Sequence, residues 1–163
     1  MELLQQLSHQ HPNAVLALAG DGPERAWLER QIPDAVFTGM LAGQGLARAF
    51  ASLDVFVHTG EAETFCQTVQ EAQASGVPVI APAVGGPLDL VDPGRTGMLY
   101  DPEDRKSLRR TVSKLVADQA LRDSLAATAL GAVSGRSWAC VVDDLVRVHY
   151  AAVTGVPGIG AAA

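Results

Sequence analysis

The chain has 163 residues, a formal net charge of −6 and a composition that is 48% hydrophobic but only 5% aromatic. This length is enough for one domain whose core needs no disulfide or structural metal. The acidic balance argues against a nucleic-acid-binding or anionic-membrane surface on this chain, and no apolar stretch approaches the ~20 residues of a membrane span.

Helices and strands alternate along the first half of the chain. Leu3, Leu4 and Leu7 recur at helical spacing before Pro12, which predicts a first helix. The apolar run that follows ends at Gly20-Asp21-Gly22 and is typical of a short buried strand. The predicted elements from there on are strand 14–19, helix 23–31, strand 35–37, helix 45–52, strand 54–58, helix 64–75 and strand 77–81.

Strands that alternate with helices predict an α/β fold with a Rossmann-like, doubly wound parallel sheet, whose ligands bind at the carboxyl ends of the strands. From Pro102 onward the pattern is wholly helical. We therefore expect one domain over 1–153 with a helical C-terminal extension, and a flexible tail over 154–163. The elements of this second half are turns at 85–87 and 92–95, strand 98–100 and helices 104–117, 120–133 and 138–153.

Two acidic residues, Glu63 and Glu71, lie eight positions apart across the predicted strand-to-helix loop and helix 64–75. Helical rise would separate them by roughly 12 Å, which suits a ligand with hydroxyls at both ends and a diphosphate between them. The free N–H groups and the dipole at the helix start favour such an anion. The alternative is that Glu63 is an ordinary first-turn acid and Glu71 a solvated helix residue.

Other reactive side chains give no comparable pattern. Cys66 and Cys140 lie far apart without metal-like spacing, so we interpret both as reduced thiols in a cytoplasmic protein. His58, Glu61 and Glu63 have irregular spacing and lack a fourth ligand, which argues against a metal site. We expect neither a metal nor a cofactor.

Several segments together resemble the retaining glycosyltransferases of family four, which have GT-B architecture. The segment from Glu63 to Glu71 and the Val77-Pro78-Val79 strand are similar to the family's donor domain, in which two acids eight residues apart flank a Phe-Gly pair. Within the family, the chain looks most like actinobacterial GDP-mannose-dependent α-mannosyltransferases that act on lipid acceptors. It is also similar to sulfolipid synthases that use UDP-sulfoquinovose. The other segments that carry the resemblance are 19–24, 36–39, 46–54, 58–61, 85–87 and 93–97.

The resemblance implies a role for each residue of the candidate site. Glu63, the catalytic-site acid, would bind hydroxyls of the donor sugar, and Glu71 would hold the ribose hydroxyls. Gly39 and Met40 would border the base. Cys66 replaces the family's usual Gly, and the helix start is expected to lower its pKa. The residues that would present backbone N–H groups to the sugar and phosphates are Phe65, Cys66, Gln67 and Thr68.

The same resemblance implies parts that this sequence does not show. Family members carry an acceptor-binding domain before this one, and their donor domain opens with a strand that ends in Gly-Arg, followed by a Lys. We therefore expect the donor-binding half of a hexosyltransferase, inactive alone, whose full-length form is cytoplasmic and peripheral to the inner membrane face. Without the first strand, the run 14–19 would be an exposed sheet edge through which the chain self-associates.

Two other functions remain as alternatives. The chain could be a non-catalytic nucleotide-sugar-binding or interaction module, or its donor could be UDP-sulfoquinovose or another UDP-sugar. A nicotinamide dehydrogenase domain is disfavoured, because Gly20-Asp21-Gly22 lacks the third glycine of the dinucleotide fingerprint and no acid follows about twenty residues later.

Overall fold

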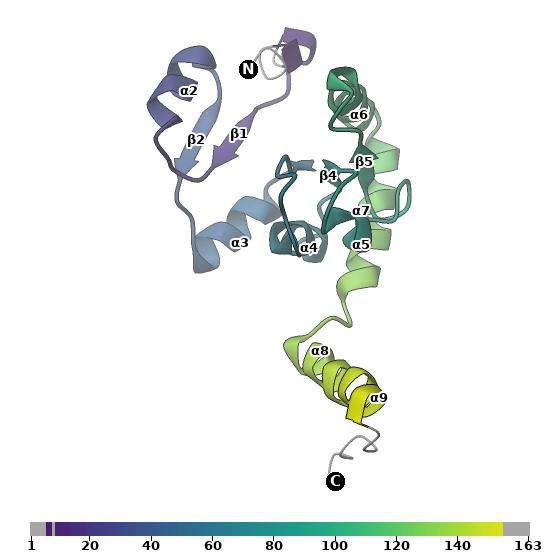
Figure 1. The fold of residues 1–163 in the computed structure, drawn as a ribbon. Coiled ribbons are helices and arrows are strands. Elements are labelled where there is room, and N and C mark those ends of the chain that lie inside the picture. Colours follow the sequence, from purple (N-terminus) through teal and green to yellow (C-terminus); the bar gives the residue numbers. More distant parts are fainter. Residues whose placement is uncertain (1–5, 8, 155–163) are drawn as a thin grey trace.

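The first part of the fold alternates helices with short parallel strands (Figure 1). The structure is a computed structural model that describes residues 6, 7 and 9–154; most of the predicted first helix and the predicted tail from 155 lie outside it. Residues 6, 7, 9 and 10 are helical. The elements are β1 (Ala17–Ala19), α2 (Arg25–Gln31), β2 (Val36–Gly39), α3 (Gly43–Ala51), β3 (Phe56–Val57), α4 (Gln67–Ala74), β4 (Val79–Pro82), α5 (Pro87–Leu90) and β5 (Met98–Tyr100).

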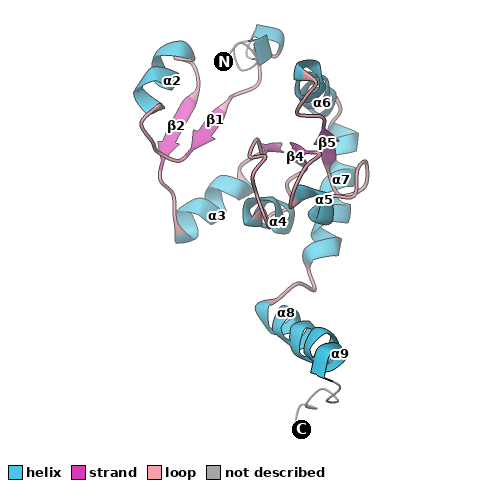
Figure 2. Cartoon of the chain, in the orientation of Figure 1, coloured by secondary structure: helices cyan, strands magenta, loops and turns pink. Residues whose placement is uncertain are grey.

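The rest of the described chain is helical, as predicted (Figure 2). Side-chain caps explain where these helices start: Asp104 accepts a hydrogen bond from the N–H of Lys106, and Asp118 accepts one from the N–H of Leu121. The single helix predicted over 138–153 is interrupted by a π-helical segment. The elements are α6 (Arg105–Ala117), α7 (Gln119–Val133), α8 (Trp138–Asp144), the π-helix η1 (Leu145–Tyr150) and α9 (Ala151–Thr154).

The strands form two parallel sheets, one with the order β1-β2 and one with the order β3-β4-β5. The α/β class and parallel pairing are confirmed, but the expected continuous sheet is divided. Within the described residues, β1 pairs with β2 alone and β3 pairs with β4 alone, so no ladder joins the two sheets. Both strands of the two-stranded sheet are therefore edge strands, as are β3 and β5 in the three-stranded sheet.

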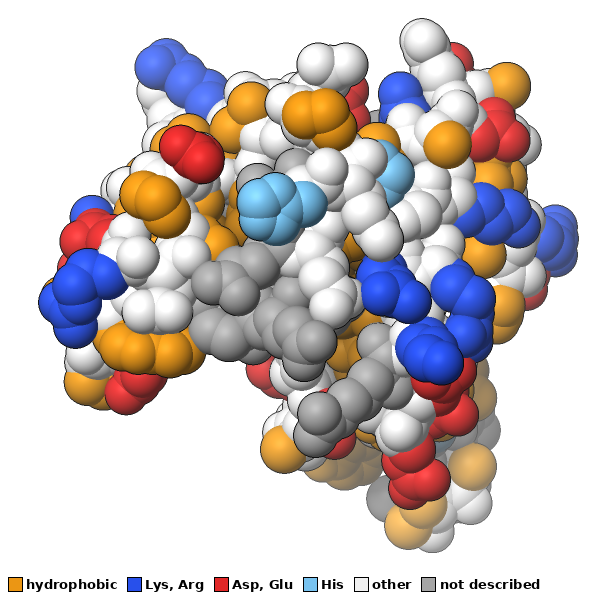
Figure 3. All heavy atoms as spheres, turned by 90° about the horizontal axis from the view of Figure 1, so that it is seen from above, with side chains coloured by type: hydrophobic (Ala, Val, Ile, Leu, Met, Phe, Trp, Pro, Cys, Tyr) orange, Lys and Arg blue, Asp and Glu red, His pale blue; other side chains and the backbone are white. Residues whose placement is uncertain are grey.

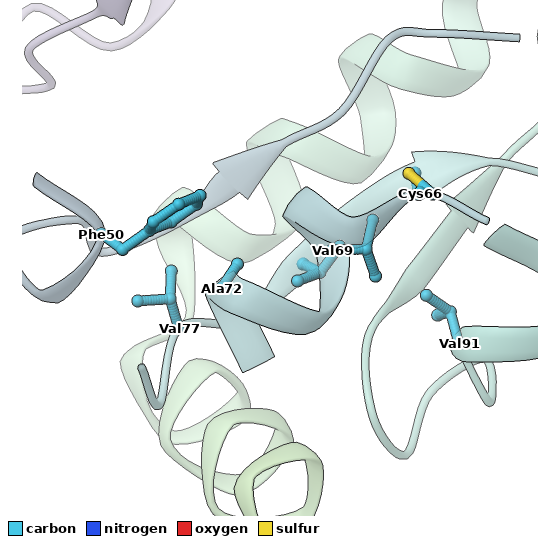
Figure 4. Close-up of a cluster of buried hydrophobic side chains, with 8 residues drawn as sticks. Phe50, Cys66, Val69, Ala72, Val77 and Val91 are labelled. Carbon is cyan, nitrogen blue, oxygen red and sulfur yellow. The ribbon is translucent and has the colours of Figure 1, made fainter. Parts of the chain in front are cut away.

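Two apolar clusters form the core, and both draw on β4, whose four residues are all buried. On one side of β4, Val69 and Ala72 of α4 lie between Phe50 and Val77 at one end of the cluster and Cys66 and Val91 at the other (Figure 4). On the other side, α6 and α7 cover the sheet. The buried residues of this second cluster are Ile80, Tyr100, Leu108, Val112, Leu115 and Leu125.

The two-stranded sheet has almost no core of its own. Over the stretch 9–45, Ile32 and Gly39 are the only buried residues, and Ala17, Ala19 and Val36 are exposed. The residues before this sheet are better anchored, because Leu7 packs against the second cluster. The side chain of His11 also bonds Ser113 of α6 at 2.9 Å. The unit of β1, α2 and β2 is therefore held mainly by its own few contacts.

The surface carries both signs of charge despite the net charge of −6. Seen from above, Lys and Arg side chains gather on the side of the molecule where α6 lies (Figure 3). No single helix in the described part of the chain is long and apolar enough to cross a membrane, although α7 together with Trp138–Tyr150 passes that test by length and composition as a bent pair.

Candidate functional site

The loop that carries Glu63 follows β3, at the carboxyl end of the three-stranded sheet, and rests on a glycine turn. The N–H of Gly86 donates to the carbonyl of Glu63 at 2.9 Å. A Cβ on Gly85 would lie 2.8 Å from that carbonyl oxygen, and a Cβ on Gly86 would lie 2.9 Å from the carbonyl of Thr64. Because these are contacts between backbone atoms, only glycine lets the turn and the loop approach so closely.

The helix after this loop begins later than the sequence predicts, at Gln67 instead of residue 64. Cys66 precedes it in the left-handed conformation, with φ 60° and ψ 58°, which an L-residue with a side chain adopts at a cost of roughly 1–2 kcal/mol. No side chain caps the helix start. The first-turn N–H groups of α4, at Gln67 and Thr68, are therefore free of a side-chain competitor for an anionic ligand.

The two acids occupy different environments. Glu63 is exposed in the loop, whereas Glu71 is half-buried one turn into α4 and accepts a hydrogen bond from Nε2 of Gln67 at 3.4 Å. The estimate of 12 Å between them does not apply, because it assumed one continuous helix from residue 64. The first turn of α4 contains no acid, so the alternative that Glu63 is an ordinary first-turn acid is wrong.

The residues between the acids differ in exposure. Phe65 is 54% exposed, Cys66 is buried, and Gln67 and Thr68 are exposed. Burial raises the pKa of the Cys66 thiol, an effect opposed by hydrogen bonds from Thr68 and the Val69 backbone and reinforced by the charge of Glu63. The predicted lowering of this pKa is therefore wrong, because desolvation of the thiol outweighs the hydrogen bonds that lower its pKa.

Thiol labelling at neutral pH is expected to modify Cys140 much faster than Cys66. Cys140 is exposed and Cys66 is buried with a raised pKa, so little of its reactive thiolate is present. The raised pKa also means that folding stability falls as the pH rises past about 8.5, where the thiol ionises in the unfolded chain. Mass spectrometry after brief labelling measures both rates. Equal rates would contradict the buried position of Cys66.

Gly39 and Met40 lie at the end of β2, on the other sheet. Gly39 is buried with φ 70°, and its carbonyl accepts from the N–H of Gly20 at 2.9 Å. A Cβ on Gly39 would lie 3.1 Å from Nη1 of Arg25, a cation that the sequence did not single out. Met40 is 76% exposed. Residues 63–71 therefore form one continuous segment that follows β3. Gly39 and Met40 lie instead at the end of β2, in the two-stranded sheet.

Two further questions about the site concern Arg95 and possible metal ligands. Arg95 is exposed and pairs with Asp92 at 2.9 Å, as a solvated turn residue does. Among the described residues, no group of three or more His, Cys, Asp or Glu is arranged to hold a metal ion. Between Glu63 and Glu71, the exposed residues offer a ligand carboxylate, hydroxyl, amide and backbone N–H groups.

Comparison with known proteins identifies the family. Residues 1–130 match the family model described as glycosyl transferases group 1. The chain belongs to this family. The match includes both sheets, the loop of Glu63 and all of α4.

Among curated members of this family, the chain is 51% identical over 148 residues to the GDP-mannose-dependent alpha-mannosyltransferase of Mycolicibacterium smegmatis, which covers 90% of this chain and 38% of that protein. It is 34% identical over 157 residues to the sulfoquinovosyl transferase SQD2 of Arabidopsis thaliana, covering 93% of this chain and 31% of that protein. The chain thus spans about a third of the length of these curated relatives.

Two solved structures share the fold. Sucrose-phosphate synthase from Thermosynechococcus elongatus superposes with a TM-score of 0.80 and 27% identity, over 95% of this chain and 42% of that one. Anabaena HepE in complex with UDP superposes with a TM-score of 0.78 and 24% identity, over 96% of this chain and 45% of that one. The GT-B, Rossmann-like class predicted from the sequence is confirmed.

Proposed function

We propose that this chain is the donor-binding half of a retaining glycosyltransferase that transfers mannose from GDP-mannose to a lipid or glycan acceptor. The observation that carries the proposal is the segment from Glu63 to Glu71: an exposed carboxylate, an uncapped helix start and a half-buried carboxylate follow one another at the carboxyl end of β3. Parallel α/β sheets bind ligands at this edge.

Each part of this segment suits one part of a nucleotide sugar. The N–H groups of Gln67 and Thr68 at the helix start favour the diphosphate. The side-chain carboxylate of Glu63 has no hydrogen-bond partner among the described residues and is free to accept from sugar hydroxyls. Glu71, further into α4 and less exposed, would accept from the ribose hydroxyls. On the second sheet, Gly39 and Met40 would border the base.

The base and sugar of the donor are the finer part of the proposal. The relative from M. smegmatis, at 51% identity, is named for GDP-mannose, which favours that donor. A UDP-sugar is the second candidate. The Arabidopsis relative, at 34% identity, is named as a sulfoquinovosyl transferase. The family resemblance implies UDP-sulfoquinovose as the donor for that activity.

Calorimetric titration of the purified chain with GDP-mannose, GDP, UDP and NAD tests the proposal. We expect GDP-mannose and GDP to bind, UDP to bind more weakly and NAD not to bind. Tighter binding of UDP than GDP would favour the second candidate. Binding of none of the nucleotides would overturn donor binding altogether and leave an interaction module as the better account.

Transfer itself is expected to need more than these 163 residues, since the relatives that carry the named activities are roughly two and a half to three times as long. We therefore expect nucleotide binding without mannosyl transfer by this chain, and transfer after fusion to the amino-terminal part of a close relative. Mannosyl transfer by the unfused chain to a glycolipid acceptor would contradict this expectation.

Self-association through β1 is the partner interaction that we propose for the chain alone. In the described residues, β1 pairs with β2 on one side only, and Ala17 and Ala19 are exposed. Replacing Ala17 with lysine is expected to shift the protein towards monomer, because a charge on an edge strand disfavours pairing with another copy. Light scattering over several days measures the shift. A wild-type protein that remains monomeric would contradict it.

A further inference from the structure

His58 ends the strand region of β3 with one ring nitrogen buried and unsatisfied. Its backbone is fixed, because its N–H donates to the carbonyl of Ile80 at 2.8 Å. Its Nε2 atom is buried and, among the described residues, has no hydrogen-bond partner. A buried polar atom left without a partner carries a free-energy cost, because it has lost its hydrogen bonds to water. A partner that arrives when the site is occupied would remove this cost.

Glu63 is an acid whose side chain lies close to the ring of His58. A Cβ on Gly60 would lie 2.9 Å from Nε2 of His58 and 3.2 Å from Cγ of Glu63, so the imidazole edge and the Glu63 side chain converge on the same glycine. Gly60 therefore leaves room for the two side chains to meet. Glu63 is exposed, and its carboxylate has no hydrogen-bond partner in the described part of the chain. A rotation of this side chain therefore breaks no hydrogen bond.

We propose that His58 is a positioning residue, whose Nε2–H donates a hydrogen bond to the carboxylate of Glu63 when the donor is bound. The bond satisfies the buried nitrogen and fixes a carboxylate that otherwise samples several rotamers in water. An oriented Glu63 then meets the sugar hydroxyls with less loss of side-chain entropy. The inference rests on the proposed function, since it concerns how the same site recognises the sugar of a nucleotide sugar.

Three variants separate the hydrogen bond from the volume of the ring. His58→Phe keeps the ring and removes both nitrogens, and it is expected to weaken GDP-mannose binding about tenfold while changing GDP binding less than twofold. His58→Gln places an amide near the position of Nε2 and is expected to restore affinity. His58→Asn places its amide near Nδ1 and is expected not to restore it. His149→Phe, on the π-helix η1, is the matched control and should leave binding unchanged.

A double-mutant cycle tests whether His58 acts through Glu63. In the Glu63→Ala background, His58→Phe is expected to cause no further loss of GDP-mannose affinity. Additive losses, or wild-type GDP-mannose affinity in His58→Phe, would overturn the inference while leaving the proposed function intact. If His58→Phe fails to fold, the comparison of His58→Gln with His58→Asn decides in its place, and equal affinities for those two would overturn it. Failure of the wild-type chain to bind any nucleotide sugar would instead refute the proposed function.

Discussion

Replacing Gly86 with alanine is expected to abolish nucleotide-sugar binding and to lower the free energy of unfolding by about 1–3 kcal/mol. The new Cβ would lie 2.9 Å from the carbonyl carbon and oxygen of Thr64 and 3.0 Å from the carbonyl carbon of Phe65. These are backbone atoms and cannot yield as a flexible side chain does. The loop must therefore move away from the turn, which also strains the 2.9 Å hydrogen bond between Gly86 and Glu63.

The experiment on Gly86 has a matched control within the same chain. Gly86 has φ −53°, which alanine adopts without strain, so the effect of the substitution is steric. Gly131 lies in α7 with nothing within 4 Å of the position of its Cβ, and its replacement by alanine is expected to stabilise the protein by up to about 1 kcal/mol. Thermal unfolding and calorimetric titration measure both variants. Wild-type donor affinity in Gly86→Ala would contradict the role of the turn in holding the loop.

Replacing Glu71 with glutamine is expected to weaken the binding of GDP and GDP-mannose alike, by about 1–3 kcal/mol, which is roughly 5- to 150-fold. Glu71 is half-buried as a residue, and the substitution would remove a charge-assisted hydrogen bond to ribose, which is stronger than a neutral one. Glu63→Ala is expected to weaken GDP-mannose binding more than GDP binding, because its proposed partner is the sugar. Calorimetric titration with both ligands measures the difference.

Glu103 provides the control for both acids. It is an exposed acid between β5 and α6, and Glu103→Ala should leave nucleotide affinity unchanged. Gln67→Ala is informative as well, because Gln67 donates to Glu71 at 3.4 Å and its removal tests whether Glu71 needs this support. A folded Glu71→Gln variant with wild-type affinity for GDP would remove the ribose role. Equal losses for GDP and GDP-mannose in Glu63→Ala would remove the sugar role.

Local sequence patterns predict the helices of the second half well. Helices α6 and α7 start within one residue of the predicted 104–117 and 120–133, since amphipathic periodicity and the caps Asp104 and Asp118 are both local signals. The start of α4 could not be predicted in the same way. Its apolar stripe continues back to Phe65, but Cys66 takes a left-handed conformation that the sequence favours only where the residue is glycine.

The candidate site is less predictable than the fold. The order of acids and helix follows from sequence, but the support of the loop by Gly85 and Gly86 depends on a contact between segments about 22 residues apart. The division of the sheet also escapes local patterns, since each strand is short and apolar in either arrangement. The raised pKa of Cys66 follows from the burial of its side chain, and helical spacing alone did not predict that burial.

The sparse packing of β1, α2 and β2 links nucleotide recognition to folding. Only Ile32 and Gly39 are buried over 9–45, so this unit is expected to open locally at a lower free energy than β4 and α4. The proposed contacts to the base, Gly39 and Met40, belong to this unit. Part of the binding free energy of the base would then be used to order these strands. Saturation with nucleotide is therefore expected to slow amide hydrogen exchange in β1 and β2 more than in β4, which is already protected. Selectivity between guanine and uracil would then depend on how well each base stabilises this loosely packed part of the domain, as well as on the atoms that contact the base.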